Sequence, residues 1–237
     1  LATSVVTGLI VGGIVGLAWW IATLLGGRRV LLRALGAEEP DEGTIARAEN
    51  LVDGLCATMG LVVPEILVVD DPSRNAVAVG WRPRDAVLVV TSGLLSSLGP
   101  VPLEGVLAHE LAHIKRGDIA PATVAAAVLL PLAAVTPAAG SVVHRWAGIG
   151  REFRADAVAV GVTRFPPGLR DALATMVEGP VPVSPSPLAD SAAARATRWL
   201  WAVAPPSMAT DEGASESGSV TGKLDAPVVR IAALDEY

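Results

Sequence analysis

The longest apolar stretch of the chain lies near its N-terminal end. Residues 5 to 27 (VVTGLIVGGIVGLAWWIATLLGG) carry no charged side chain, and a helix of this length can cross a hydrocarbon core of about 30 Å. Trp19 and Trp20 lie toward one end of it, and three arginines follow, at positions 28, 29 and 33. The positive-inside tendency then places the rest of the chain in the cytoplasm. We therefore expect a transmembrane anchor over residues 1–27 and a second domain over 28–237. A signal peptide is the alternative, but its basic residues would precede the apolar run.

After the arginines, the single long apolar run gives way to shorter segments in which apolar and polar positions alternate at helical or strand spacing. Residues 38–60 space their apolar side chains at helical intervals and predict an amphipathic helix that ends at Gly60. Three short β-branched runs follow, at 65–70, 75–81 and 86–91. They predict a small antiparallel or mixed sheet.

The second half of the chain is predicted to be mainly helical. Helical patterns cover residues 101–117 and 150–162, and an uncharged run, 119–143, lies between them. Residues 180–187 form a proline-rich loop, residues 205–222 lack large hydrophobic side chains, and a short amphipathic segment closes the chain. The expected fold class is therefore α+β.

Composition supports a membrane segment beside a folded part. The chain of 237 residues is 51% hydrophobic but only 4% aromatic, with a mean hydropathy of +0.52. Its net charge is −6 and no basic stripe is present, so a nucleic-acid partner is not expected. The single cysteine, Cys56, allows no internal disulfide and is expected to be a small core residue. Because the chain begins with Leu1 instead of Met, we expect an earlier segment to be missing.

The predicted helix 101–117 carries the clearest chemical motif, HELAH. On a helix His109 and His113 share a face, so each can direct one imidazole nitrogen at a single zinc ion. Glu110 lies too far around the helix to be a ligand, but it can take a proton from a water that zinc has acidified. This is the chemistry of amide hydrolysis, and it requires a third protein ligand.

Several residues are candidates for that ligand. The chain lacks the further histidine of the metzincin extension, and Cys56 is remote from any ligand pattern. His144 follows the apolar run, where an interfacial position explains it equally well. Glu152 is the best candidate, because Asp156 would share its helical face and could hold a ligand histidine. A solvated charged face is an equally good interpretation of this pair from spacing alone.

Four motifs in this order resemble those of the HtpX-like membrane zinc metallopeptidases, relatives of the CAAX prenyl proteases. The motifs are RNAVAVG (74–80), AVLVVTSGLL (86–95), LEGVLAHELAHIKRGD (103–118) and REFRADAVAV (151–160). The resemblance extends from the anchor to about residue 163, with a weaker similarity at the C-terminus. It implies a zincin-like core in which the HExxH helix packs on the glutamate-bearing helix. It also implies one zinc ion held by His109, His113 and Glu152, with Glu110 as general base, and cleavage of membrane or misfolded proteins at the cytoplasmic side of the cell membrane.

The chain departs from the family between the two ligand helices. Members often carry two hydrophobic segments there, whereas only 38 residues separate His113 from Glu152. A single membrane crossing would put these two side chains on opposite sides of the bilayer. We therefore expect residues 119–143 either to turn back within the membrane or to lie as a buried or surface hairpin, with Pro131 and the TPAAG sequence (136–140) as the places to bend.

A second departure lies near the C-terminus. The family often has a histidine and an arginine that are thought to stabilise the oxyanion, and here Leu224 stands in place of the histidine while Arg230 is kept. Arg230 is therefore a candidate catalytic residue, although an arginine on a helix surface is equally consistent. The family also suggests that a substrate pairs with the strand containing Asn75, Ala76, Val77 and Ala78. For Asn75 an ordinary turn residue is the equal alternative.

The sequence thus predicts a membrane-anchored zinc endopeptidase whose partners are polypeptide substrates and the lipid bilayer. The alternative is a catalytically weak or inactive membrane scaffold that binds zinc or unfolded chains. A hydrolase such as a deformylase is disfavoured, since no ligand cysteine is suitably placed. The sequence indicates no oligomeric state.

Overall fold

The computed structural model describes residues 2–41, 43–135, 150–178, 201–202 and 226–236. The helices in this part of the chain are α1 (Ala2–Ala34), α2 (Ala46–Met59), η1 (Pro83–Asp85), α3 (Ser92–Ser97), α4 (Pro100–Arg116), α5 (Ile119–Val135), α7 (Arg151–Thr163), α8 (Pro166–Glu178) and α11 (Pro227–Asp235). The strands are β1 (Glu65–Val69), β2 (Ala76–Val79) and β3 (Val87–Thr91). These elements form the expected α+β core beside a long apolar helix.

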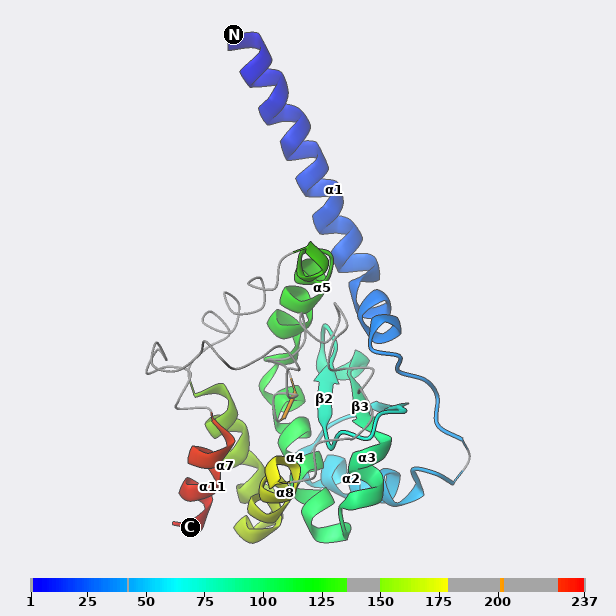
Figure 1. Cartoon of the computed structure of the whole chain (residues 1–237), viewed down its shortest axis with the longest axis vertical. Coiled ribbons are helices and arrows are strands. Elements are labelled where there is room, and N and C mark those ends of the chain that lie inside the picture. The colour runs from blue at the N-terminus through cyan, green and yellow to red at the C-terminus, as the bar shows by residue number, and fades with distance from the viewer. Residues whose placement is uncertain (1, 42, 136–149, 179–200, 203–225, 237) are drawn as a thin grey trace.

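Helix α1 extends away from all other elements, which gather at its C-terminal end (Figure 1). Its segment Ser4–Thr23 has a mean hydropathy of 2.1 and is not buried by the rest of the protein, so it is long and apolar enough to cross a membrane. The helix continues through the arginines without a break to Ala34. Leu31 and Leu32, near this end, are buried in the same apolar cluster as the sheet. The apolar segment and the folded part are therefore joined by one continuous helix.

The sheet is mixed and has the order β1-β3-β2. β1 pairs with β3 in parallel and β2 pairs with β3 in antiparallel, which confirms the three predicted strands. Alternate side chains enter two different cores. Ala76 and Ala78 face the core that contains α4, while Val77 and Val79 face the core shared with α1 and α5. The sheet thus separates the HELAH helix from α1, and β2 forms one edge.

Helix α4 is the central element of the larger core. Its residues from Gly105 to Ile114 are buried, and it packs against α2, α7, α8 and β2. It begins at Pro100 and ends at Gly117, whose φ of 74° is in the left-handed region that glycine favours. A Cβ atom on Gly105 would lie 2.7 Å from the Leu169 backbone, so α8 can pack closely only because this residue is glycine.

Helix α2 is shorter than predicted. It begins at Ala46 instead of residue 38, because Pro40 and the positive φ of Gly43 interrupt the helical conformation. The preceding Glu38 instead forms a β-bridge with Val68. The helix ends at Gly60, as the pattern predicted.

The apolar run 119–143 is helical as far as it is described. α5 continues past Pro131 to Val135, so the chain does not reverse at this proline. α5 starts directly after α4 and packs along α1, while α7 starts again beside α4 (Figure 1). The TPAAG sequence, the other expected place to bend, lies outside the described residues. Whether this segment enters a bilayer stays a prediction.

Candidate active site

The two histidines of the HELAH motif lie on one buried face of α4. His109 and His113 are each about 1% exposed. Their Nε2 atoms are 3.2 Å apart. Two ligands of a tetrahedral zinc at 2.0–2.1 Å are separated by about 3.3 Å, so both nitrogens are already spaced for one ion.

Glu152 completes the group from the first turn of α7. Its Oε2 lies 3.2 Å from His109 Nε2, and its Oε1 lies 3.6 Å from His113 Nε2. One ligand atom from each of the three residues lies within 4.8 Å of the others. With a side-chain exposure of 13%, Glu152 is not part of a solvated face. Two imidazoles and one carboxylate match the His₂Glu donor set of catalytic zinc sites, with a fourth position left for water or substrate.

Each histidine is held from behind by a carboxylate. Asp156 Oδ1 lies 2.8 Å from His109 Nδ1, as the sequence suggested. Asp118 Oδ1 lies 2.9 Å from His113 Nδ1. In both rings this leaves Nε2 for a metal, which is the arrangement that fixes the tautomer and orientation of ligand histidines.

Asp118 was not predicted. It follows Gly117, whose left-handed conformation ends α4 and turns the chain back toward His113. A helix-terminating glycine followed at once by an acid, five residues after a ligand histidine, is the signal that could have identified it.

Arg230 reaches this site from α11 near the C-terminus. It is 1% exposed, so it is not a surface arginine. Its Nε and Nη2 donate hydrogen bonds of 2.7 Å to the two oxygens of Asp156. Its Nη1 donates to the Ala202 carbonyl at 2.8 Å and lies 3.4 Å from Glu152 Oε2. In this arrangement Arg230 orients two carboxylates, that of Asp156 behind His109 and that of Glu152 beside it.

Glu110 lies on the same helix but faces the edge of the sheet. Its Oε2 accepts a hydrogen bond of 2.8 Å from the Ala78 backbone N–H. Its Oε1 is buried and has no hydrogen-bond partner among the described residues. Burial raises the pKa of Glu110 above its ordinary value, although His113 and His109 oppose this shift. A buried oxygen with a raised proton affinity next to three ligand atoms fits a site that holds a water molecule beside a metal.

Glu152 and His109 each have a pKa that is shifted by the charged groups around them. Burial alone raises the pKa of Glu152, but hydrogen bonds from His109 and His113 hold it well below its usual range. Burial and the charge of Arg230 lower the pKa of His109, yet its bonds to Asp156 and Glu152 outweigh them and raise it to about 9. The carboxylates around the two histidines therefore favour a positive charge in this position, which is the electrostatic environment that a metal ion requires.

The predicted substrate strand lies at the open edge of β2, but its polar groups are partly engaged. The Ala76 carbonyl accepts a hydrogen bond of 3.1 Å from the Ala202 N–H, and Ala78 donates to Glu110. Val77 directs its side chain into the opposite core. Asn75 is 3% exposed, and its backbone N–H and carbonyl both bond to Thr91, as a structural turn residue would.

The other candidate from the sequence that the structure describes, Cys56, is not part of this group. Cys56 is buried in the core on α2, and His144 and Leu224 lie outside the described residues. The proline-rich loop 180–187 and the segment 205–222 also lie outside them. Among the described residues, His109, His113 and Glu152 are the group with metal-ligand geometry.

Comparisons with known proteins agree with this geometry. The sequence profile of Peptidase family M48 matches residues 45–207, which include all three ligand candidates and Glu110. The chain is 34% identical over 176 residues to a protein named "Protease HtpX homolog" from Dictyoglomus thermophilum, covering 61% of this chain and 58% of that protein. It is 30% identical over 213 residues to one of the same name from Tropheryma whipplei, covering 71% and 73%. A further one from Streptococcus thermophilus is 29% identical over 207 residues, covering 70% and 69%. The chain thus spans about three fifths of the Dictyoglomus relatives that it matches.

Proposed function

Because the chain belongs to peptidase family M48, we propose that it is a membrane-anchored, zinc-dependent endopeptidase. The observation that carries the proposal is the meeting of Glu152 with the two histidines of HELAH, 43 and 39 residues away in the sequence, at distances that one ion can bridge. His109, His113 and Glu152 would hold one zinc ion per chain. When bound, such an ion acidifies a water molecule and polarises a carbonyl group.

Glu110 is proposed as the general base. Its Oε1 is the buried oxygen that needs a partner, and it would accept a proton from the attacking water and pass it to the leaving amine. The Ala78 N–H fixes the other oxygen, so Glu110 keeps one orientation while the proton moves. The raised pKa brings its proton affinity closer to that of a group that must both take and release a proton near neutral pH.

Asp156, Asp118 and Arg230 are proposed as positioning residues. The two aspartates hold the Nδ1 side of the ligand histidines, and Arg230 neutralises Asp156 and Glu152 in a buried environment. A direct role of Arg230 at the substrate oxyanion would require its Nη1 to leave the Ala202 carbonyl.

Polypeptides in extended conformation are the proposed substrates, in particular membrane or misfolded proteins. A substrate strand would lie along the edge of β2 between Ala76 and Ala78, next to Glu110, and would compete with Ala202 for the Ala76 carbonyl. With α1 as the anchor and the arginines on its cytoplasmic side, the proposed active site would face the cytoplasm at the cell membrane. The helix α1 continues rigidly into the core, which favours an anchor over a cleaved signal peptide.

The experiment is cleavage of an unstructured reporter by the purified full chain in detergent or nanodiscs, with its zinc content measured in parallel. We expect Glu110→Gln to keep its zinc and to lose activity by roughly 10²–10⁴-fold. The matched control is Glu104→Gln, on the same helix but outside the site, which should behave like wild type. We expect His109→Ala and Glu152→Ala to lose zinc.

Two results would contradict the proposal. Equal activity of wild type and Glu110→Gln would show that Glu110 is not the general base. Full zinc retention in Glu152→Ala would show that Glu152 is not a ligand. A zinc-loaded wild type that cleaves no reporter would favour the alternative, a membrane scaffold without turnover.

A further inference from the structure

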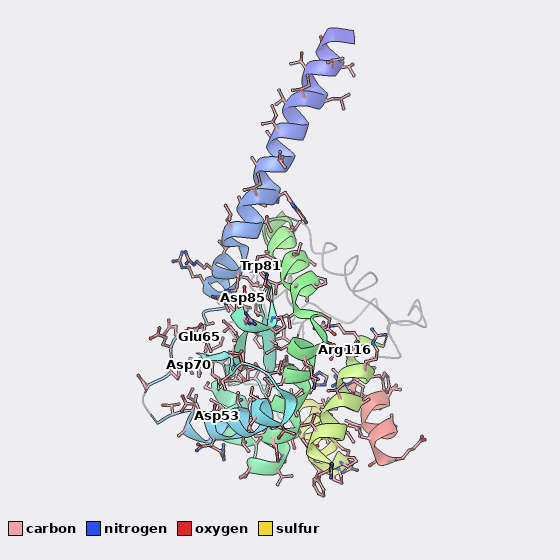
Figure 2. The ribbon with its side chains drawn as sticks, turned by 180° about the vertical axis from the view of Figure 1, so that it is seen from behind. Asp53, Glu65, Asp70, Trp81, Asp85 and Arg116 are labelled. Carbon is pink, nitrogen blue, oxygen red and sulfur yellow. The ribbon has the colours of Figure 1, made fainter. Side chains whose placement is uncertain are left out.

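The turn between β2 and β3 is attached to α1 at the point where the apolar segment ends. This turn, Trp81 to Asp85, contains the short helix η1. A Cβ atom on Gly27 would lie 3.7 Å from Cζ2 of Trp81, so the indole ring lies against α1 at this residue. The next residue, Arg28, donates a hydrogen bond to the Asp85 backbone carbonyl. Figure 2 shows Trp81 and Asp85 at the end of the folded part from which α1 extends.

The turn is also rigid. The Asp85 Oδ1 accepts hydrogen bonds from the backbone N–H of Trp81 at 3.1 Å and of Arg82 at 2.6 Å. Pro83 fixes the backbone at the start of η1. The Asp85 carboxylate is therefore used to close the turn, and the side chains of Arg82 and Arg84 project from a fixed frame into solvent.

Four arginines thus lie around one end of the protein. We call Arg28, Arg29, Arg82 and Arg84 the basic collar. Arg29, Arg82 and Arg84 are exposed, and none of them pairs with a carboxylate within the part of the chain that the structure describes. The whole chain has a net charge of −6, so the collar is opposite in sign to the protein that carries it.

The collar lies at a definite depth relative to the apolar segment. Arg28 follows Thr23, the end of that segment, by five residues, which is about 7.5 Å along a helix. The headgroup region on each side of a bilayer is about 5–8 Å thick. Trp19 and Trp20, both about half exposed, lie a little more than two helical turns before Arg28, at the end of the apolar segment where interfacial aromatic residues are found. Trp81 and the collar would therefore lie among the phosphates of the lipid headgroups.

From this placement we propose that the basic collar binds the headgroups of anionic phospholipids and thereby fixes the orientation of the proposed active site at the membrane surface. The inference rests on the proposed function in one respect, that α1 spans a membrane. Its contribution goes beyond an anchor: α1 alone would leave the whole protein free to turn about the helix axis, whereas the arginines of the η1 turn add a second contact with the membrane surface. Each arginine near an anionic leaflet strengthens such a contact by roughly fivefold at moderate salt.

The collar is directly connected to the catalytic machinery. Ala78 in β2, which holds Glu110, precedes Trp81 by three residues, or about 10 Å of extended chain. Gly80, between them, donates a hydrogen bond of 3.0 Å to Thr123 Oγ1 of α5. Headgroups bound at the turn would therefore hold the edge of β2 close to the bilayer, where segments emerging from the membrane could reach it.

The experiment uses the full chain in nanodiscs, either of neutral phosphatidylcholine or of a mixture rich in phosphatidylglycerol. A fluorophore is attached to the cysteine of Pro83→Cys in a Cys56→Ala background, and energy transfer to a headgroup-labelled lipid is measured. We expect higher transfer in anionic nanodiscs than in neutral ones, and a decrease toward the neutral-lipid value as salt is added. Arg82→Glu with Arg84→Glu should reduce transfer to the neutral-lipid value, while Arg82→Lys with Arg84→Lys should retain most of it.

A matched control keeps the total charge change the same. Arg47→Glu with Arg164→Glu reverses two exposed arginines on α2 and after α7, and it should leave the transfer unchanged. Equal transfer in both lipids, or no effect of reversing Arg82 and Arg84 in a variant with wild-type zinc content, would overturn the proposal. If inorganic phosphate displaced the turn from anionic nanodiscs and added neutral salt did not, the result would point to a free-phosphate site. That result would also overturn the proposal.

These results are separable from a failure of the proposed function. If alkaline carbonate released the wild type from liposomes, α1 would not be an anchor and both proposals would fall. If the protein stayed inserted and cleaved its reporter but the turn did not respond to lipid charge, the collar alone would be wrong.

Discussion

Arg230 and Asp156, 74 residues apart in the sequence, form a buried two-point pair in which both hydrogen bonds measure 2.7 Å. The same aspartate oxygen that accepts from Nη2 lies 2.8 Å from His109 Nδ1. The C-terminal helix α11 is thereby connected through a single carboxylate to a proposed metal ligand. The orientation of His109 therefore depends on a residue that no local pattern relates to it.

We predict that Arg230→Met weakens both folding and zinc binding. Removal of one partner leaves the Asp156 charge buried without compensation, which typically costs about 3–5 kcal/mol of stability. Loss of a well-placed support behind a ligand histidine typically weakens metal affinity by about 10–100-fold. Thermal unfolding with and without chelator, and zinc titration against a competing chelator, measure the two effects.

The control for this prediction is Arg170→Met. Arg170 bonds to Asp171 and Asp235, but its guanidinium is exposed, so solvent screens the pairs. It should leave zinc affinity at the wild-type value. Comparable losses of zinc affinity in the two variants would show that α11 supports the site only by general packing.

Asp118→Asn should weaken zinc binding while the fold is retained. The asparagine can keep a hydrogen bond to His113 Nδ1 but removes the negative charge that increases the basicity of the ring. Burial raises the pKa of Asp118, but contact with His113 outweighs this and lowers it, so the carboxylate is ionised at neutral pH and its charge acts on the histidine. We expect a loss of about 10–100-fold in zinc affinity by chelator competition. Asp53→Asn, an exposed change on α2, is the control. A zinc affinity equal to that of wild type in Asp118→Asn would mean that His113 is oriented by packing alone.

The sequence predicted those features that depend on local spacing. The strands were predicted from short β-branched runs, and the end of α4 from Gly117, which favours the left-handed conformation that it adopts. The pairing of His109 with His113 follows from helical geometry. The assignment of Glu152 as a ligand needed the family resemblance. The spacing of Glu152 and Asp156 alone fits equally well a solvated charged face and a metal ligand with a carboxylate behind a ligand histidine.

Features that depend on distant packing could not be predicted. Nothing near Arg230 in the sequence indicates that it is buried, because its partners come from α7 and from Ala202. The engagement of the Ala76 carbonyl by Ala202 is equally remote. The start of α2 was missed for a local reason, since Gly43 adopts a positive φ that composition alone does not require. Long-range ion pairs in a buried site are set by tertiary contacts that one sequence does not contain.

Gly105→Ala should destabilise the protein although alanine is the better helix former. The added methyl group would lie 2.7 Å from backbone atoms of Leu169, which cannot rotate away, so α4 and α8 must separate. Overpacking of this kind typically costs about 1–3 kcal/mol. The control is Gly54→Ala on α2, where a Cβ would meet nothing within 4 Å, and where we expect a gain of about 0.5–1 kcal/mol. Chemical denaturation measures both, and a stabilised Gly105→Ala variant would show that α8 is not held against α4 as described.

The thiol of Cys56 should be unreactive in the native protein. It is 1% exposed in the core beside α4, and burial, with a smaller contribution from Asp53, raises its pKa to about 11. Below that pKa the thiol is protonated, so at pH 8 only about one molecule in a thousand carries the reactive thiolate. Alkylation by iodoacetamide, followed by mass spectrometry, should therefore be slow in buffer and complete in denaturant. The thiol introduced by Ala57→Cys in a Cys56→Ala background, exposed at the adjacent position, should react rapidly in the folded protein. Similar native rates at the two positions would contradict the placement of Cys56 in the core and the packing of α2 on α4 that depends on it.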